Sequence, residues 1–191
     1  KDVGIVQTGT TPPTKDRSNY GDYIPFVKPA HFRQDGSINH GDSMLSESGL
    51  SKGRLFEAHS VLMVCIGATI GKTGFTDVPV SSNQQINALT PSVDYEAKLL
   101  YYALISPFVQ KQVMVTGKSA QATLPIINKS KWEKLRINLP IDISEQKEIV
   151  VILEDLKDQT MQLEAHYQTK LASLDELKKS ILQKAFAGEL T

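Results

Sequence analysis

The sequence predicts an α+β protein in two parts. A mixed α/β globular domain spans residues 1–140, and a single long coiled-coil-forming α-helix spans residues 141–191. Three observations predict this organisation. Glycine and proline are frequent in the first 41 residues, short β-prone runs lie between turn signals, and both residue types are missing between Ile141 and Ala187.

The first part contains short strands and one helical region. Apolar, β-prone runs predict strands over residues 23–27, 61–66 and 86–89. A helical pattern covers residues 95–115, and Pro107 is expected to kink it or divide it in two. A short helical turn and a strand over 135–139 are expected next, closed by Pro140.

The stretch CIGATIGKTG, residues 65–74, looks almost like a phosphate-binding loop. Such a loop needs four residues between its first glycine and its Gly-Lys-Ser/Thr, so that backbone N–H groups wrap a phosphate. Here the loop is one residue short, and Ile66 stands where the first glycine should be. The sequence therefore predicts a tight turn between two strands, with Lys72 left to meet an anion other than a nucleotide.

The long helix shows apolar residues at alternating spacings of four and three, which is typical of a coiled-coil seam. Its predicted pairing residues are Ile149, Leu153, Leu156, Leu163, Tyr167, Leu174, Leu177 and Ile181. We expect a partner helix from another chain or from a missing half of this one; a helix folded back on its own domain is the alternative. Gly188 is the expected stop.

Composition excludes several classes. The chain has 191 residues, 40% of them hydrophobic and 22% charged, and no apolar run approaches the ~20 residues of a membrane span. These values predict a soluble, cytoplasmic protein without membrane partners. The chain begins at Lys1 rather than Met, which suggests an excised or processed piece. A single cysteine excludes an internal disulfide, and Cys65 is expected to be a small buried hydrophobe.

No catalytic constellation is visible in the sequence. Its four histidines are scattered, without metal-ligand spacing, and no nucleophile-elbow motif or glycine-rich cofactor loop appears. Asp77 with Glu96 and Lys98 only faintly suggests a nuclease, because the last two residues open a helix. We therefore expect a binding domain on a coiled-coil rod: not an enzyme, with no metal and no cofactor of its own.

The net charge and the distribution of charged residues point in different directions on nucleic-acid binding. The formal net charge is zero, which argues mildly against a general nucleic-acid binder. Residues 111–136, however, carry six basic residues and one acid. A solvated surface of mixed charge is the alternative interpretation of such a cluster.

Several motifs, in order, resemble one family. GTTPPTKDRSNYGDYIPFVKPAHF resembles the opening of target recognition domains in specificity subunits of type I restriction-modification systems, with Phe26 in place of the usual Trp. GATIGKTG and SSNQQINAL are similar to the middle of such domains. Residues 139–150 and the final LKKSILQKAFAGEL are similar to the start and end of the family's conserved helical region.

The resemblance implies a non-catalytic subunit that reads one half of a split double-stranded DNA target. It implies docked modification subunits that use S-adenosylmethionine to methylate adenine, and restriction subunits that use ATP and Mg²⁺. A complete subunit has two recognition domains and two helices that pair antiparallel. Only one of each is present here, so the chain resembles the C-terminal half of a subunit or a natural half-length one, and self-association or a second half-subunit is expected.

Base reading needs polar side chains on loops, and cations to hold the DNA backbone. The predicted phosphate contacts are Lys15, Arg17, Lys52, Arg54, Lys72 and Lys118. The predicted base readers or polar positioners are Arg33, Gln34, Asn83, Gln84, Ser119 and Gln121. Residues 83–85 have an alternative role as structural hydrogen bonders, because buried amides usually satisfy backbone groups.

Two other functions remain open at this point. One is a coiled-coil assembly or scaffold protein whose globular head binds protein, which the neutral net charge slightly favours. Steep salt dependence of DNA binding would exclude it, because phosphate contacts release counterions. The other is the recognition module of a single-chain restriction-methyltransferase.

Overall fold

The computed structural model of the chain describes residues 3–117 and 124–189. It divides into two compact units, residues 1–147 and 148–191, each of which is described here by itself. The architecture is a mixed α+β domain with two four-stranded sheets, followed by a long helix. The predicted fold class is confirmed.

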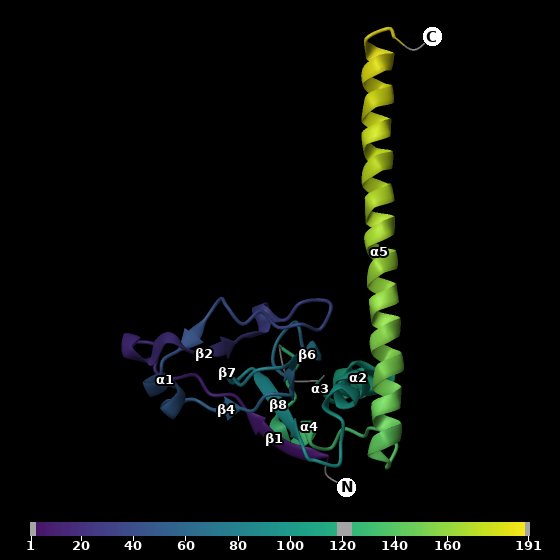
Figure 1. The fold of residues 1–191 in the computed structure, drawn as a ribbon. Helices are drawn as coiled ribbons and strands as arrows, with labels where there is room; N and C mark the ends of the chain where they lie inside the picture. Colours follow the sequence, from purple (N-terminus) through teal and green to yellow (C-terminus); the bar gives the residue numbers. More distant parts are fainter. Residues whose placement is uncertain (1–2, 118–123, 190–191) are drawn as a thin grey trace. The chain divides into compact units, whose positions relative to one another are not determined.

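The first unit contains two small sheets (Figure 1). The first has the order β1 (Gly4–Thr8), β8 (Ile86–Pro91), β5 (Ser60–Val64) and β6 (Thr73–Thr76), and all its neighbours are antiparallel. The second has the order β3 (Met44–Leu45), β2 (Tyr20–Val27), β7 (Val80–Ser82) and β4 (Leu55–Phe56), with β2 and β7 parallel. The predicted strands at 23–27, 61–66 and 86–89 therefore all exist.

The helices of the first unit are short. They are α1 (Glu47–Lys52), α2 (Ala97–Ile105), α3 (Pro107–Gly117) and α4 (Lys129–Trp132), with 3-10 turns η1 (Arg17–Asn19) and η2 (Pro29–His31). The predicted helix at Pro107 is divided in two. Ser106 adopts an extended conformation with ψ 147°, as the residue before a proline prefers, and Pro107 then opens α3.

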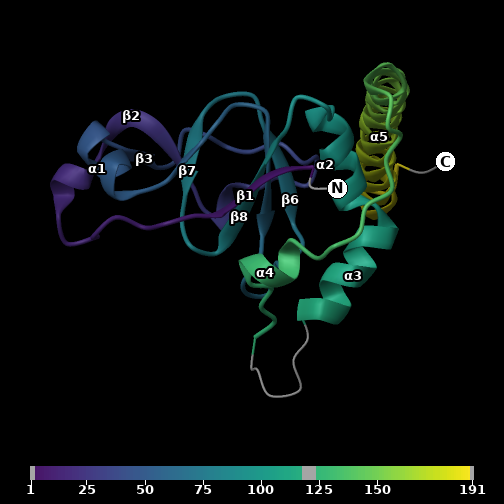
Figure 2. The same ribbon diagram turned by 90° about the horizontal axis from the view of Figure 1, so that it is seen from below.

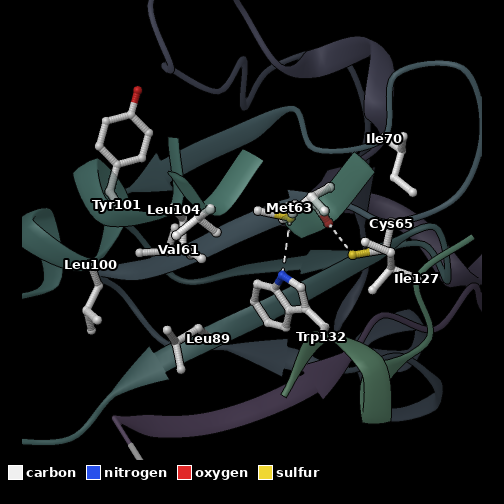
Figure 3. Close-up of a cluster of buried hydrophobic side chains, with 12 residues drawn as sticks. Val61, Met63, Cys65, Ile70, Leu89, Leu100, Tyr101, Leu104, Ile127 and Trp132 are labelled. Carbon is white, nitrogen blue, oxygen red and sulfur yellow. Dashed lines mark hydrogen bonds between the residues drawn. The ribbon is translucent and has the colours of Figure 1, made fainter. Parts of the chain in front are cut away.

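The largest core cluster lies where β5 meets α2, α3 and α4 (Figure 3). Val61 and Met63 of β5 share this cluster with Leu100 and Leu104 of α2, and the side chain of Trp132 completes it from α4. The Trp132 indole Nε1–H donates to Met63 Sδ at 3.2 Å, so the polar group of this buried ring is satisfied. Figure 2 shows the small helix α4 and the pair α2–α3 as separate parts of the first unit.

The predicted strand at 135–139 is wrong. This segment has no regular secondary structure and belongs to neither sheet. Leu135, Ile137 and Leu139 pack against the largest core cluster, which explains their alternation in the sequence. The backbone of Arg136 is paired by a side chain: its N–H donates to Gln112 Oε1 at 3.0 Å, and its carbonyl accepts from Gln112 Nε2 at 2.9 Å. Burial of alternate side chains therefore produced a strand-like pattern without a sheet partner.

The long helix, α5, spans Ile143–Phe186. Asp142 Oδ1 caps its start by accepting from the Ser144 N–H at 2.8 Å, and Gly188 ends it with φ +73°, as predicted. Its 44 residues give a length of roughly 66 Å at 1.5 Å per residue. None of residues 148–189 is buried, although apolar side chains recur along them. Among the described residues, no helix is long and apolar enough to cross a membrane.

Candidate nucleic-acid interface

Four of the predicted phosphate contacts lie on two segments that pack together. Lys15 and Arg17 belong to the segment around η1, and Lys52 and Arg54 lie at the end of α1 and just after it. The Lys52 ammonium joins the two segments, because it lies 3.1 Å from Asp16 Oδ2 and 2.7 Å from Asn19 Oδ1. We call these four exposed cations the basic patch.

Asp16 opposes part of this positive charge. Hydrogen bonds from Ser18, and then from Lys52, lower the pKa of the Asp16 carboxyl below its ordinary value, so it stays ionised at neutral pH. Lys52 is therefore partly engaged inside the chain. Lys15 and Arg17 are exposed beside it and are better placed to meet a phosphate.

A second group of predicted DNA contacts, Lys72, Arg33 and Gln34, lies at and beside the tight turn formed by residues 65–72. This turn connects β5 to β6, which confirms the predicted tight turn between two strands. The Lys72 ammonium donates to the Phe32 carbonyl. This bond connects the tight turn to the residue that precedes Arg33 and Gln34. Arg33 and Gln34 are both exposed. Figures 1 and 2 show β6 and α1 at different ends of the domain, so this group is separate from the basic patch.

Three segments that are far apart in the sequence meet at the start of this same tight turn. The Gly9 and Thr10 N–H groups donate to the carbonyls of Ile86 and Ser82, at 2.9 and 2.8 Å. The Cys65 N–H donates to the Gln85 carbonyl at 2.7 Å. These bonds hold three segments together, residues 9–11, 65–72 and 82–86, which we call the loop cluster.

The loop cluster also borders the third predicted loop. The Gly67 N–H donates to the Pro125 carbonyl at 3.1 Å, and Ile66 pairs with Ile126 in an isolated bridge. The predicted residues Lys118, Ser119 and Gln121 lie outside the described residues. The described residues that flank them, Gly117 and Leu124 to Ile126, thus stand beside the turn of Lys72.

Within the loop cluster, the polar side chains have different tasks. Asn83 Nδ2 donates to Gln85 Oε1 at 2.9 Å, and Asn83 Oδ1 accepts from the Gln85 N–H at 3.2 Å. The structural alternative for Asn83 is therefore favoured. Gln84 is exposed, and its Oε1 accepts from the Thr11 hydroxyl at 2.6 Å. Sequence reasoning missed Thr11, although it lies in the GTTPP stretch that carries the family resemblance.

Gly9 makes the close approach of these loops possible. A methyl group at this position would lie 2.2 Å from the Asn83 carbonyl oxygen and 2.2 Å from Ser82 Oγ. Gly9→Ala is therefore expected to lower the free energy of unfolding by about 1–3 kcal/mol, as overpacking does, measured by urea denaturation. Gly41→Ala is the matched control, because its methyl group would meet only Asn39 Oδ1, at 3.7 Å, and should change stability by less than about 0.5 kcal/mol. Equal losses in both variants would contradict this account of Gly9.

The remaining reactive side chains fit structural positions. Burial raises the pKa of the Cys65 thiol to about 12, so it is a protonated core residue, as predicted. No group of three His, Cys, Asp or Glu side chains that could hold a metal ion occurs within residues 3–117 and 124–189. A groove of about 930 Å³ runs beside β1 and residues 133–141, and it contains none of the predicted site residues.

Comparison with known proteins identifies the family. The model for "Type I restriction modification DNA specificity domain" matches residues 1–173. The chain is 27% identical to the specificity subunit of the type I restriction enzyme HindI of Haemophilus influenzae, over 99% of this chain and 40% of the relative. It is 30% identical to the EcoBI specificity subunit of Escherichia coli, over 82% of this chain and 34% of the relative.

Solved structures agree with these sequence relatives. The HsdS subunit of Thermoanaerobacter tengcongensis has a TM-score of 0.66 and 26% identity, covering 98% of this chain and 44% of that one. A chain from a structure of the type I R-M system has a TM-score of 0.71 at 23% identity, covering 97% of this chain and 44% of that one, and shows the same fold. The chain thus spans about two fifths of the length of the relatives it matches. With a family model that matches most of its length, this chain belongs to the type I restriction modification DNA specificity domain family.

Proposed function

We propose that this chain reads one half of a split double-stranded DNA target for a type I restriction-modification complex. The observation that carries the proposal is the family match over residues 1–173. It is supported by the loop cluster, in which two of the motifs that resemble target recognition domains are hydrogen-bonded to each other, and one of them also to Cys65, two residues before the third motif. Such an arrangement presents polar side chains from separate loops on a common scaffold, as base reading requires.

The chemistry is assigned to other subunits in this proposal. Modification subunits would carry S-adenosylmethionine and methylate adenine, and restriction subunits would carry ATP and Mg²⁺. This chain would supply the choice of sequence and a surface on which the modification subunits dock. The absence of a cofactor loop from the sequence, together with the family match, supports this division of labour.

The long helix would set the distance between two such domains. Its seam residues Leu156, Leu163 and Tyr167 are 52–56% exposed, which is costly for side chains of this size in water. A second helix packed antiparallel against the seam would cover them. We propose that this helix comes from a second copy of the chain or from another half-subunit.

The basic patch gives the first test, in which the chain is titrated with duplexes over a range of salt concentrations. Lys15→Ala is expected to weaken binding to all duplexes about equally and to reduce the slope of log K against log salt by about one unit, because one phosphate contact is lost. Asp16→Asn should have the opposite effect on affinity, since it removes a carboxylate from the patch.

An exposed lysine of the long helix, Lys179, supplies the matched control, and Lys179→Ala should leave both affinity and slope unchanged. Binding that is insensitive to salt in the unaltered chain would contradict DNA binding through phosphates. It would favour a scaffold protein whose head binds protein.

A further inference from the structure

The loop of residues 83–85 is fixed from several sides. The Asn83 side chain bonds to both the side chain and the backbone N–H of Gln85, and the Ile86 N–H donates to the Asn83 carbonyl at 3.2 Å. The Gln85 carbonyl accepts from the N–H of Cys65, a buried residue that directly follows β5. The backbone of Gln84 is therefore fixed, because the side chains of Asn83 and Gln85 on either side of it are used in hydrogen bonds within the loop.

Gln84 is the exposed side chain of this fixed loop. Its Oε1 accepts from the Thr11 hydroxyl at 2.6 Å across 73 residues of sequence. Thr11 is itself held close by the bonds of Gly9 and Thr10 to the backbone of residues 86 and 82. Within the part of the chain that the structure describes, the Gln84 Nε2 group has no acceptor, so the side chain presents two N–H donors from an oriented amide.

An oriented donor selects among base edges. A free glutamine usually pairs with adenine, because its oxygen accepts from adenine N6 while its nitrogen donates to N7. Here the Thr11 hydroxyl occupies one of the two lone pairs of the oxygen, whereas both N–H donors remain available, which favours a base edge that offers acceptors only. Guanine offers N7 and O6 side by side in the major groove.

We propose that Gln84 is a specificity-determining residue that donates to a guanine of the DNA target, and that Thr11 is the positioning residue that fixes its amide. This inference rests on the proposed function as a DNA reader. It assigns Asn83 and Gln85 to holding the loop and not to contact with bases.

Selection of bound duplexes from a randomised library, followed by sequencing, tests the proposal. The unaltered chain is measured first, and enrichment of a defined sequence is the test of the proposed function itself. If no sequence is enriched, that function fails before Gln84 is tested. Given an enriched sequence, Gln84→Ala should reduce the preference for guanine at one position by roughly 5- to 150-fold and should leave the base preference at every other position unchanged.

A base analogue separates a contact from an indirect effect. Replacing the selected guanine by 7-deazaguanine removes the N7 acceptor, so the unaltered chain should lose affinity while Gln84→Ala should not respond. Gln84→Glu replaces the donors by acceptors and should shift the preference at that position to cytosine, whose N4 amino group donates.

Two variants of Thr11 test its positioning role. Thr11→Val removes the hydroxyl at nearly constant shape and should broaden the same position to accept adenine, because the released Oε1 can accept from N6. Thr11→Ser retains the hydroxyl and should restore the preference for guanine. A purely structural role would change the melting temperature, or the affinity for all duplexes, without changing preference at one position.

Three outcomes would overturn the inference. They are a uniform loss of affinity for all sequences in Gln84→Ala, a preference for thymine or adenine at the position that this variant affects, and an unaltered preference in Thr11→Val. The first would make Gln84 a phosphate contact, and the third would leave Thr11 without a positioning role. Gln84 is exposed, so its variants should fold, and an unchanged urea midpoint verifies this.

Discussion

Exchange of residues 1–140 for the same segment of another family member is expected to move adenine methylation completely to a new DNA sequence. The complex is reconstituted from the chimeric chain, the modification subunits and S-adenosylmethionine, and methylated sites are mapped by sequencing. The physical reason is that the loop cluster and the basic patch, with all their side-chain contacts, lie within the exchanged segment. Neither the long helix nor the modification subunits would then carry the sequence information.

The reciprocal exchange is the control for this experiment. Replacing residues 141–191 and keeping residues 1–140 should leave the half-site sequence unchanged. The spacing between the two half-sites can change, because the length of the replaced helix sets it in this proposal. The unaltered chain by itself should methylate no DNA. Methylation by the isolated chain, or an unchanged site after exchange of the first domain, would show that the proposed division of labour is wrong.

Replacement of both Leu156 and Leu163 by aspartate is expected to abolish association through the long helix. Both residues lie on the predicted seam, and both are about half exposed in the single chain, at 52% and 54%. In a paired helix each aspartate would be a buried, unpaired charge that costs several kcal/mol, on the order of 3–5 each. Sedimentation velocity at about 10 µM or above should show a dimer for the unaltered chain, at a concentration chosen to favour association, and a monomer for the variant.

A matched double variant separates the seam from general effects on the helix. Met161 follows position 160, which lies on the seam four residues after Leu156, and Leu182 follows the seam residue Ile181. Both therefore lie off the seam, although both are 47% exposed. Met161→Asp with Leu182→Asp adds the same charge at a similar cost in helix propensity, but it should leave the dimer intact. A monomeric unaltered chain would contradict self-pairing, and equal loss of the dimer in both variants would contradict the predicted seam.

Several features followed from the sequence because their cause is local. The long helix is encoded by spacing and by an uninterrupted run without glycine or proline, and its end is encoded by Gly188, which adopts φ +73°. Pro107 divides the preceding helix because a proline disfavours helical geometry at the residue before it. The missing residue of the GATIGKTG loop was enough to predict a strand connection, since a phosphate loop depends on its length.

Other features depended on groups far apart in the chain, and only the tertiary structure decided them. Leu135, Ile137 and Leu139 alternate as in a strand, but whether such a segment joins a sheet depends on a neighbour for its backbone, and here Gln112 pairs with it instead. The ammonium of Lys72 meets the Phe32 carbonyl 40 residues away, and the hydroxyl of Thr11 meets Gln84 73 residues away. A residue's type states which hydrogen bonds it can make, whereas its partner is chosen by the packing of the whole domain. The sequence by itself therefore determined the family, the long helix and the polar and basic side chains that the chain contains. The fold decided which of those side chains are engaged within the protein and which are presented to solvent.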